Sequence, residues 1–331
     1  MRLNTGALWD IAKGVAVFLA AIAALISAVA GTATASPSSK NTNRESAPGG
    51  GFFVTVSGPN QPAVKLHGID VGPRRARTIV LLHGLGASSY SWRRVISRLS
   101  RRYRVIALDL RGHGRSDKPF DVHYAVTAQA ELVRDALAKL KLRRVTLVGH
   151  SYGGVVSLVA TLQANARRER RIRRLVIMNS PALPQKLSTA VRFLQQPVLP
   201  YVALTVVPPH ITVSMALFAE AFGMPHITEQ DIEIYAQPYL DAAARHALIE
   251  TARQIVPRNA ADLIKAYPSV RQQTLVVWCR SDQVVPLITG QRLARMLPNA
   301  RLEVLEGCDH ATPEQKPDDI ARLISRHVSR R

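Results

Sequence analysis

The strongest indication of the fold is a glycine-rich segment in the middle of the chain, Val148-Gly149-His150-Ser151-Tyr152-Gly153-Gly154. It joins an apolar run at 145–148, typical of a buried strand, to residues 154–165, whose composition favours a helix. The pattern Gly-x-Ser-x-Gly at such a junction puts the serine on a sharp turn, because a Cβ on its glycine neighbours would collide with the adjacent strand and helix. The sequence therefore predicts a nucleophilic Ser151; the alternative is a serine that only caps the helix.

Outward from this turn, apolar runs alternate with helix-like stretches. The expected strands cover 52–57, 63–71, 78–83, 105–110, 145–148, 175–178, 275–278 and 302–305, and the expected helices cover 91–99, 128–140, 154–165, 287–296 and 317–328. Such alternation predicts an α/β fold with a mostly parallel central sheet and helices on both faces. Residues 182–268 interrupt the alternation with apolar, helix-like pieces, so we interpret them as a helical cap inserted between core segments 51–181 and 269–331.

The first 50 residues resemble a targeting segment. Residues 14–30 form an uncharged apolar run of 17 residues, preceded by Arg2 and Lys13 and followed by the small residues at 33–36. This order predicts a signal peptide or an N-terminal membrane anchor over residues 1–35 and export of the rest of the chain; a buried core helix is the alternative. The Ser-, Asn-, Pro- and Gly-containing segment 36–50 is expected to be a flexible linker.

A serine nucleophile needs a base and a group that orients the base. His310 follows the last expected strand and Asp282 follows the one before it, so both are expected at the same edge of the sheet as Ser151. The chain order Ser151, Asp282, His310 is the order known for this arrangement on an α/β sheet. We therefore predict these three residues as a catalytic triad.

Other acids near His310 are less suitable partners for its ring. Glu303 and Glu306 fall within the expected last strand, and Asp309 is covalently adjacent to the histidine. The strand that ends at 178 is followed by Asn179 and not by a carboxylate. Asp282 therefore remains the predicted orienting acid.

The tetrahedral intermediate of acyl transfer also needs hydrogen-bond donors for its oxyanion. The turn His83-Gly84-Leu85-Gly86 directly follows a strand, so the Leu85 amide is one expected donor and the Tyr152 amide is the other. His83 could itself be taken for a catalytic histidine. We expect it instead to hold the turn through its ring nitrogens.

Together these motifs resemble the α/β-hydrolase superfamily, and specifically its serine esterases and lipase-like members with a helical cap. The resemblance covers nearly all of residues 52–331 and rests on HGLG at 83–86, DLRGHGRSDKP at 109–119, GHSYGG at 149–154 and the loops that carry Asp282 and His310. It implies that residues 182–268 form a lid over the active site. It also implies that Arg111, His113 and Asp117 belong to the scaffold.

The resemblance also limits the kinds of reaction that we expect. Ser151 argues against the members with an aspartate nucleophile, such as epoxide hydrolases and haloalkane dehalogenases. Members that cleave carbon–carbon bonds often carry Trp after the catalytic histidine, where this chain has Ala311. The expected activity is cleavage of carboxylic esters through an acyl-enzyme, without a cofactor. A C–C bond hydrolase, another acyl-transfer enzyme and a non-catalytic ligand-binding protein remain alternatives.

The chain has two cysteines, and both lie close to predicted triad residues. Cys279 stands where relatives commonly have Gly, and Cys308 precedes His310 by two positions. Because their loops must converge and an exported chain can be oxidised, we consider a disulfide between them. Two small buried thiols that pack near the site are the alternative.

The segment 197–222 within the cap carries Glu220 as its only formal charge, so it could line an acyl pocket or face lipid. Together with export, this favours an apolar acyl or lipid-like ester as substrate; ordinary core-facing surface is the alternative. The cap histidines have no metal-ligand spacing, and no metal site is expected. They are His210, His226 and His246.

The formal net charge of +21, from 44 Lys and Arg against 23 Asp and Glu in 331 residues, is concentrated in one region. Residues 51–181 hold 24 basic and 7 acidic side chains, with basic clusters at 93–104 and 167–174, whereas residues 182–268 hold 6 and 7. An apolar fraction of 47% excludes wholesale disorder and many membrane spans. Export and the esterase-like motifs argue against a nucleic-acid partner. The charge could instead hold the protein against an anionic membrane or cell-wall surface, with solvated surface charge as the alternative.

Overall fold

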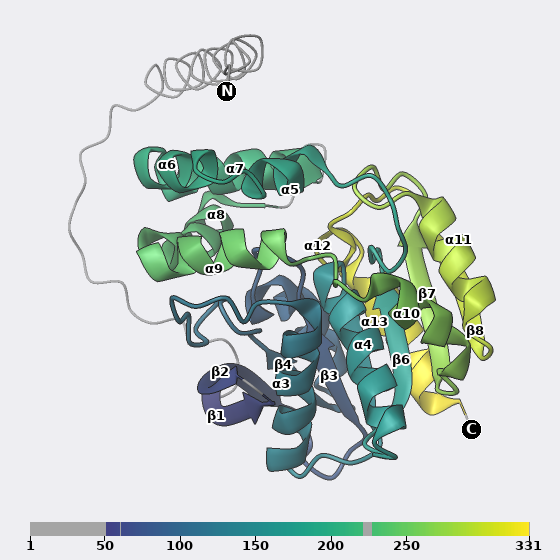
Figure 1. Cartoon of the computed structure of the whole chain (residues 1–331). Coiled ribbons are helices and arrows are strands. Elements are labelled where there is room, and N and C mark those ends of the chain that lie inside the picture. The colour runs from purple at the N-terminus through teal and green to yellow at the C-terminus, as the bar shows by residue number, and fades with distance from the viewer. Residues whose placement is uncertain (1–50, 60, 221–226, 331) are drawn as a thin grey trace. The chain divides into compact units, whose positions relative to one another are not determined.

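The computed structural model describes residues 51–59, 61–220 and 227–330 (Figure 1). The expected targeting segment and linker at 1–50 lie outside the described residues, as does His226. The strands are β1 (Gly51–Gly58), β2 (Gln61–Val71), β3 (Thr78–Leu82), β4 (Arg104–Leu108), β5 (Val145–His150), β6 (Ile172–Met178), β7 (Gln273–Cys279) and β8 (Ala300–Leu305).

These strands form one sheet in the order β1-β2-β4-β3-β5-β6-β7-β8. β2 runs antiparallel to β1 and to β4, and all the remaining neighbours are parallel. The expected mostly parallel sheet is therefore confirmed. Because the strands from β3 to β8 point the same way, their carboxyl ends lie along one edge, and the loops that follow them can meet there.

Helices cover both faces of the sheet, as expected. One face packs against α3 (Val126–Lys139), α4 (Tyr152–Ala166) and α11 (Leu287–Met296), and the other against α2 (Arg93–Leu99), which follows a short 3-10 turn, and α13 (Pro317–Ser329). The alternation along β3 shows how one strand serves both layers: Val80 and Leu82 face the first, Ile79 and Leu81 the second. All four side chains are fully buried, and each contributes about 1.5–3 kcal/mol.

The segment between β6 and β7, here called the insertion, is helical. It comprises α5 (Thr189–Leu194), α6 (Leu199–Val206), α7 (Pro209–Glu220), α8 (Glu229–Ala236), α9 (Ala242–Arg253) and α10 (Ala260–Ala266). Figure 1 shows α5 to α9 grouped at one end of the core, whereas α10 lies beside α4. Thus the end of the predicted cap packs against the core.

In the part of the chain that the structure describes, no helix taken alone has the length and apolar character needed to cross a membrane. Only together do α6 and residues Pro209–Phe218 of α7 satisfy those criteria, and a bend of 114° separates the two helices.

Arginines gather at the amino ends of the parallel strands, here called the amino edge. Arg77 precedes β3, Arg144 precedes β5, and Arg173 and Arg174 lie at the start of β6. Burial, followed by the charges of these neighbours, lowers the pKa of the Arg174 guanidinium. Two of the arginines donate hydrogen bonds to carbonyls near the end of α13, Arg77 to Val328 (2.6 Å) and Arg174 to that of residue 330.

Candidate active site

Ser151 lies on a strained turn between β5 and α4. Its φ of 50° and ψ of −119° place a non-glycine residue in a sparsely populated region. The turn needs glycine neighbours: a Cβ on Gly149 would lie 2.2 Å from the carbonyl oxygen of Gly153, and one on Gly153 would lie 2.5 Å from that of Leu82. The Ser151 side chain makes no capping hydrogen bond to α4, so the hydroxyl is not a helix cap.

The structure brings the three predicted catalytic side chains into one hydrogen-bonded row. His310 Nε2 lies 3.0 Å from Ser151 Oγ, and His310 Nδ1 lies 3.0 Å and 3.2 Å from the two carboxylate oxygens of Asp282. With Asp282 ionised, Nδ1–H donates to the carboxylate and Nε2 is left to accept the serine proton. This is the arrangement that general-base activation of a serine requires.

Asp282 is held in its ionised form by several donors. The amides of Val284 and Val285 donate to Oδ1 at 2.9 and 2.8 Å, and Asn179 Nδ2 donates to Oδ2 at 2.6 Å. Burial alone would raise the pKa of Asp282, but the hydrogen bond and charge of His310, the Val285 amide and the Asn179 amide lower it below its usual value.

The other acids that the sequence offered do not orient the histidine ring. Glu306 follows β8 and does not lie within it, contrary to the sequence prediction, and its carboxylate pairs with Arg280 at the surface at 2.6 Å. Asp309 is buried, which raises the pKa of its carboxyl, and its backbone amide donates to Gln315 Oε1. Asp282 is the acid that contacts His310 Nδ1.

Three further residues support the triad, and sequence reasoning gave none of them a role. Asn179, which follows β6 at a φ of 45°, donates to Asp282, and Thr312 Oγ1 donates to Asn179 Oδ1 at 2.6 Å. His150 Nε2 donates to the His310 carbonyl at 2.8 Å, and burial lowers the pKa of His150 to about 3. The one available signal was the position of Asn179 directly after a strand, because Asn tolerates positive φ.

The two predicted oxyanion donors lie next to Ser151. Tyr152 is the first residue of α4, so its amide has no acceptor within the helix. The turn that carries Leu85 approaches the nucleophile closely, since a Cβ on Gly84 would lie 3.3 Å from the Ser151 Cβ. His83 holds this turn as expected: its Nε2 accepts from the Leu110 amide at 3.0 Å, which leaves Nδ1–H to donate to the Gly84 carbonyl at 2.7 Å.

The residues of the 109–119 turn lie in the scaffold. Arg111 is fully buried and pairs with Asp121, and the Asp117 carboxylate accepts from the Lys65 amide at 2.7 Å. His113 is buried too, and burial, followed by the charge of His83, lowers its pKa to about 3.

The insertion is tied to the loops of the site by polar contacts. Tyr239 donates to the carbonyl of Gly86, in the oxyanion turn, at 2.8 Å. Arg93 at the start of α2 pairs at 2.6 Å with Asp231 of α8 and at 2.6 Å with Glu314, which lies shortly after His310. Part of the basic cluster at 93–104 is therefore engaged in internal ion pairs and is not simply solvated.

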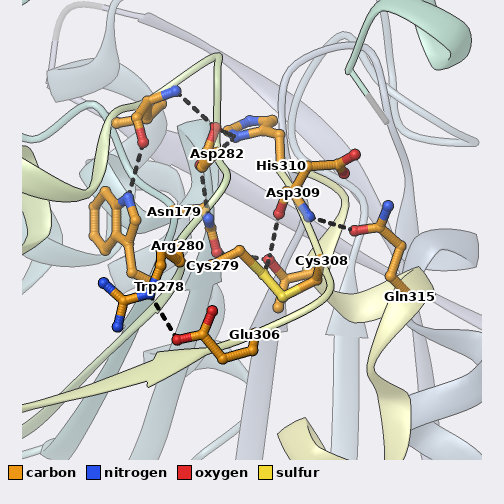
Figure 2. Close-up of a disulfide and its surroundings, with 12 residues drawn as sticks. Asn179, Trp278, Cys279, Arg280, Asp282, Glu306, Cys308, Asp309, His310 and Gln315 are labelled. Atoms are coloured by element: carbon orange, nitrogen blue, oxygen red, sulfur yellow. Dashed lines mark hydrogen bonds and ion pairs between the residues drawn. A yellow bond between two sulfur atoms is a disulfide. The ribbon is translucent and has the colours of Figure 1, made fainter. Parts of the chain in front are cut away.

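The two cysteines form a disulfide (Figure 2). The Cα atoms of Cys279 and Cys308 are 5.5 Å apart, and the bond connects the loop of Asp282 to the loop of His310. Of the alternatives left open by the sequence, the bridge and not the pair of free thiols is present.

Among the described residues, no group of three or more His, Cys, Asp or Glu side chains is arranged to hold a metal ion.

Comparison with known proteins agrees with this fold. The family model described as alpha/beta hydrolase fold matches residues 77–317. An uncharacterized hydrolase of Bacillus subtilis is 29% identical over 262 residues, covering 76% of this chain and 89% of the relative. The 2-hydroxy-6-oxo-2,4-heptadienoate hydrolase of Pseudomonas putida is 28% identical over 272 residues, covering 78% and 90%.

Among solved structures, a membrane phospholipase A superposes with a TM-score of 0.70 at 22% identity, covering 98% of this chain and 96% of that protein. At this identity the likeness concerns the fold alone. The family match extends over most of the chain and includes both Ser151 and His310, so this protein belongs to the α/β-hydrolase family.

Proposed function

We propose that this hydrolase cleaves carboxylic esters. The observation that carries the proposal is the continuous row of hydrogen bonds from Ser151 through His310 to Asp282. A serine so placed becomes a nucleophile at neutral pH, and acyl transfer to it further requires hydrogen-bond donors for the oxyanion.

The reaction then follows from the geometry. His310 Nε2 removes the proton as Ser151 Oγ attacks the ester carbonyl, and Asp282 stabilises the imidazolium that forms. The amides of Leu85 and Tyr152 stabilise the oxyanion. The intermediate collapses when His310 returns the proton to the leaving alcohol, and water releases the acyl group by the same steps in reverse.

An apolar acyl or lipid-like ester is the proposed substrate class. Support comes from the insertion, where Val198, Val202 and Val206 recur every four residues on one side of α6 and are 64%, 52% and 73% exposed. In α7, Phe218 is 67% exposed. Exposed apolar side chains this close together favour contact with an apolar partner.

Hydrolysis of a carbon–carbon bond is the second candidate. It is favoured by the relative from Pseudomonas putida, whose name describes a dienoate hydrolase. Against it stands Ala311, at the position after the catalytic histidine where such enzymes often carry Trp.

The test compares the full-length protein with two serine variants. Ser151→Ala removes the nucleophile, and Ser97→Ala changes an exposed serine on α2 as a matched control. We expect fluorophosphonate labelling and turnover of nitrophenyl esters in wild type and Ser97→Ala only, with kcat/KM rising from acetyl to longer chains. Turnover of a 2-hydroxy-6-oxo dienoate without ester turnover would favour the second candidate. Folded protein with neither activity nor labelling would favour a ligand-binding role.

We propose further that the protein is exported and rests against an anionic membrane or cell-wall surface. Export rests on the sequence of residues 1–35, as a signal peptide or anchor. The exposed Arg173 at the amino edge and the excess of basic side chains in residues 51–181, 24 against 7 acidic, support the anionic partner. Binding to vesicles at low salt should rise with anionic lipid content. Equal binding to zwitterionic vesicles would refute the proposal.

A further inference from the structure

His310 is carried by a weakly supported part of the sheet. Its loop follows β8, which is the last strand in the sheet order and pairs with β7. Every residue of β8 is partly exposed, whereas six of the seven residues of β7 are buried. Because an edge strand has a neighbour on one side only, the backbone of the sheet holds this loop less firmly than it holds Ser151.

The disulfide connects this loop to the buried strand. Cys279 is the last residue of β7 and fully buried, and Cys308 lies two residues before His310 at 6% exposure. Asp282 follows Cys279 by three residues. The bridge therefore joins the segment of the base to the segment of the acid at the point where both leave the sheet (Figure 2).

The bridge also touches the hydrogen bonds that hold Asp282. Cys279 Sγ lies 3.3 Å from Thr312 Oγ1. That hydroxyl donates to Asn179 Oδ1 at 2.6 Å, and Asn179 Nδ2 donates to Asp282 at 2.6 Å. The hydroxyl of Thr312 has one proton, and its shortest hydrogen bond is the one to Asn179, with the Asp309 carbonyl as a second acceptor at 3.2 Å.

We propose that the Cys279–Cys308 disulfide is a positioning element of the catalytic machinery. It holds His310 within hydrogen-bond distance of both Ser151 and Asp282, so turnover, and not stability alone, depends on it. The proposal rests on the function proposed above for the triad. It predicts an effect on kcat in particular, because the bridge contacts the acid and base loops and not the oxyanion turn or the insertion.

The first test reduces the folded full-length protein. Dithiothreitol breaks the S–S bond, two protein thiols form, and the reagent is oxidised to its cyclic disulfide. Thiol titration should find no free thiol before treatment and two after it. At a temperature where circular dichroism shows the reduced protein folded, kcat for a nitrophenyl ester should fall about tenfold or more with KM within about twofold, since misplaced catalytic groups cost rate. Reoxidation should restore kcat.

A readout specific to positioning is the pH profile. When His310 moves away from the Asp282 carboxylate, its imidazolium loses a stabilising charge. The acidic limb of kcat/KM should therefore move to lower pH in the reduced protein. A bridge that only stabilises the fold would lower the melting temperature and leave this limb and kcat in place.

The variant Cys279→Ser/Cys308→Ser should behave as the reduced enzyme does and should not respond to dithiothreitol. The rate of fluorophosphonate labelling is followed in parallel, because it reports on Ser151 whatever the natural substrate is. If no form of the protein turned over esters but the labelling rate still depended on the bridge, the proposed ester substrate would be refuted and the proposed role of the disulfide would stand. If the double variant does not fold, Thr312→Val is used instead. It keeps the bridge but removes the hydroxyl between Cys279 and Asn179, and we expect a smaller fall in kcat. Free thiols in the purified protein, or equal kcat and labelling rates with and without the bridge, would overturn the proposal.

Discussion

The two edges of the sheet carry polar side chains of opposite character. At the edge formed by the carboxyl ends of the parallel strands, here called the carboxyl edge, Asp282 and His310 are buried and hydrogen-bonded to each other. At the amino edge, guanidinium groups of like charge crowd together, and Arg174 Nε and two nitrogens of Arg301 have no hydrogen-bond partner among the described residues. The same buried apolar strands connect these two ends.

The helices explain the difference. In a parallel sheet each strand leads into a helix, so helix N-termini gather at the carboxyl edge and helix C-termini at the amino edge. The start of α4 at Tyr152 presents free amides beside Ser151, where we propose that the oxyanion forms, whereas carbonyls at the end of α13 and just after it accept from Arg77 and Arg174. One edge is thus suited to anions that form during a reaction, and the other to permanent cations.

The largest effect should come from removing the nucleophile. Ser151→Ala should lower kcat for a nitrophenyl ester about 10⁶-fold, because base and acid cannot act without the group that they activate. Thermal stability should stay close to that of wild type, since alanine meets the same backbone strain at a φ of 50°. Steady-state kinetics with active-site titration measure the loss. Residual kcat above one hundredth of wild type would place the nucleophile elsewhere.

Both edges should lose stability in acid. Burial, followed by the charge of Arg301, lowers the pKa of His327 near the amino edge to about 4, and that of His113 near the other edge is lowered to about 3. Unfolding returns each to about 6.5, so as the pH falls below this value the unfolded chain takes up protons that the folded chain refuses. His150, whose pKa burial also lowers to about 3, is a third such group. The free energy of unfolding should therefore fall by about 4 kcal/mol per pH unit between about pH 6 and pH 5, and stay level above pH 7.5.

Urea denaturation at several pH values checks this slope, and His327→Gln should reduce it by about a third. The reduction would separate the contribution of the amino edge from that of the carboxyl edge. A stability that stays constant from pH 7 to pH 5 would show that these histidines are protonated in the folded protein.

A smaller effect is expected from the residue that orients the acid. Asn179→Ala removes one of the hydrogen bonds to Asp282 and leaves a buried oxygen less satisfied, which costs about 1–3 kcal/mol. We expect kcat to fall about ten- to a hundredfold with KM nearly unchanged. Asn165→Ala, on the outer part of α4, is the matched control. Equal kinetics in both variants would mean that the two valine amides suffice to hold Asp282.

The smallest effect should come from relieving repulsion at the amino edge. Arg173 is exposed and its charge lowers the pKa of Arg174. Arg173→Gln should raise the melting temperature by about 1–2 °C at low salt and by less in 0.5 M salt, where screening already weakens the repulsion. Differential scanning calorimetry at two salt concentrations measures both values. A melting temperature that falls, or a gain that grows with salt, would contradict the picture of crowded like charges.

The predicted triad could be found in the sequence because each of its residues lies in a loop that leaves the carboxyl end of a strand. Ser151 directly follows β5, Asp282 lies three residues after β7 and His310 lies five residues after β8, so the strand ends and their common direction sufficed to place all three at one edge. The sheet and its two helical layers followed from the same alternation of apolar runs.

Contacts between distant loops were not predictable in the same way. Asn179 and Thr312 meet across 133 positions of sequence, and no local pattern specifies such a pair. Likewise, basic clusters along the chain were visible in the sequence, whereas the order of the strands gathers Arg77, Arg144 and Arg174 from separate segments. Adjacent arginines in sequence were therefore an incomplete guide to the charged surface.

The place of β8 at the end of the sheet has a consequence for biosynthesis. Strands β1 to β6 and the serine turn are complete before the ribosome has made the insertion, and both partners of the serine lie beyond it. A chain that folds from its N-terminus can therefore assemble most of the sheet while it is still chemically inert. On the proposed function, activity begins only when residue 310 has emerged and the edge strand has docked, so we expect chains that end early to be inactive even when most of their core is formed.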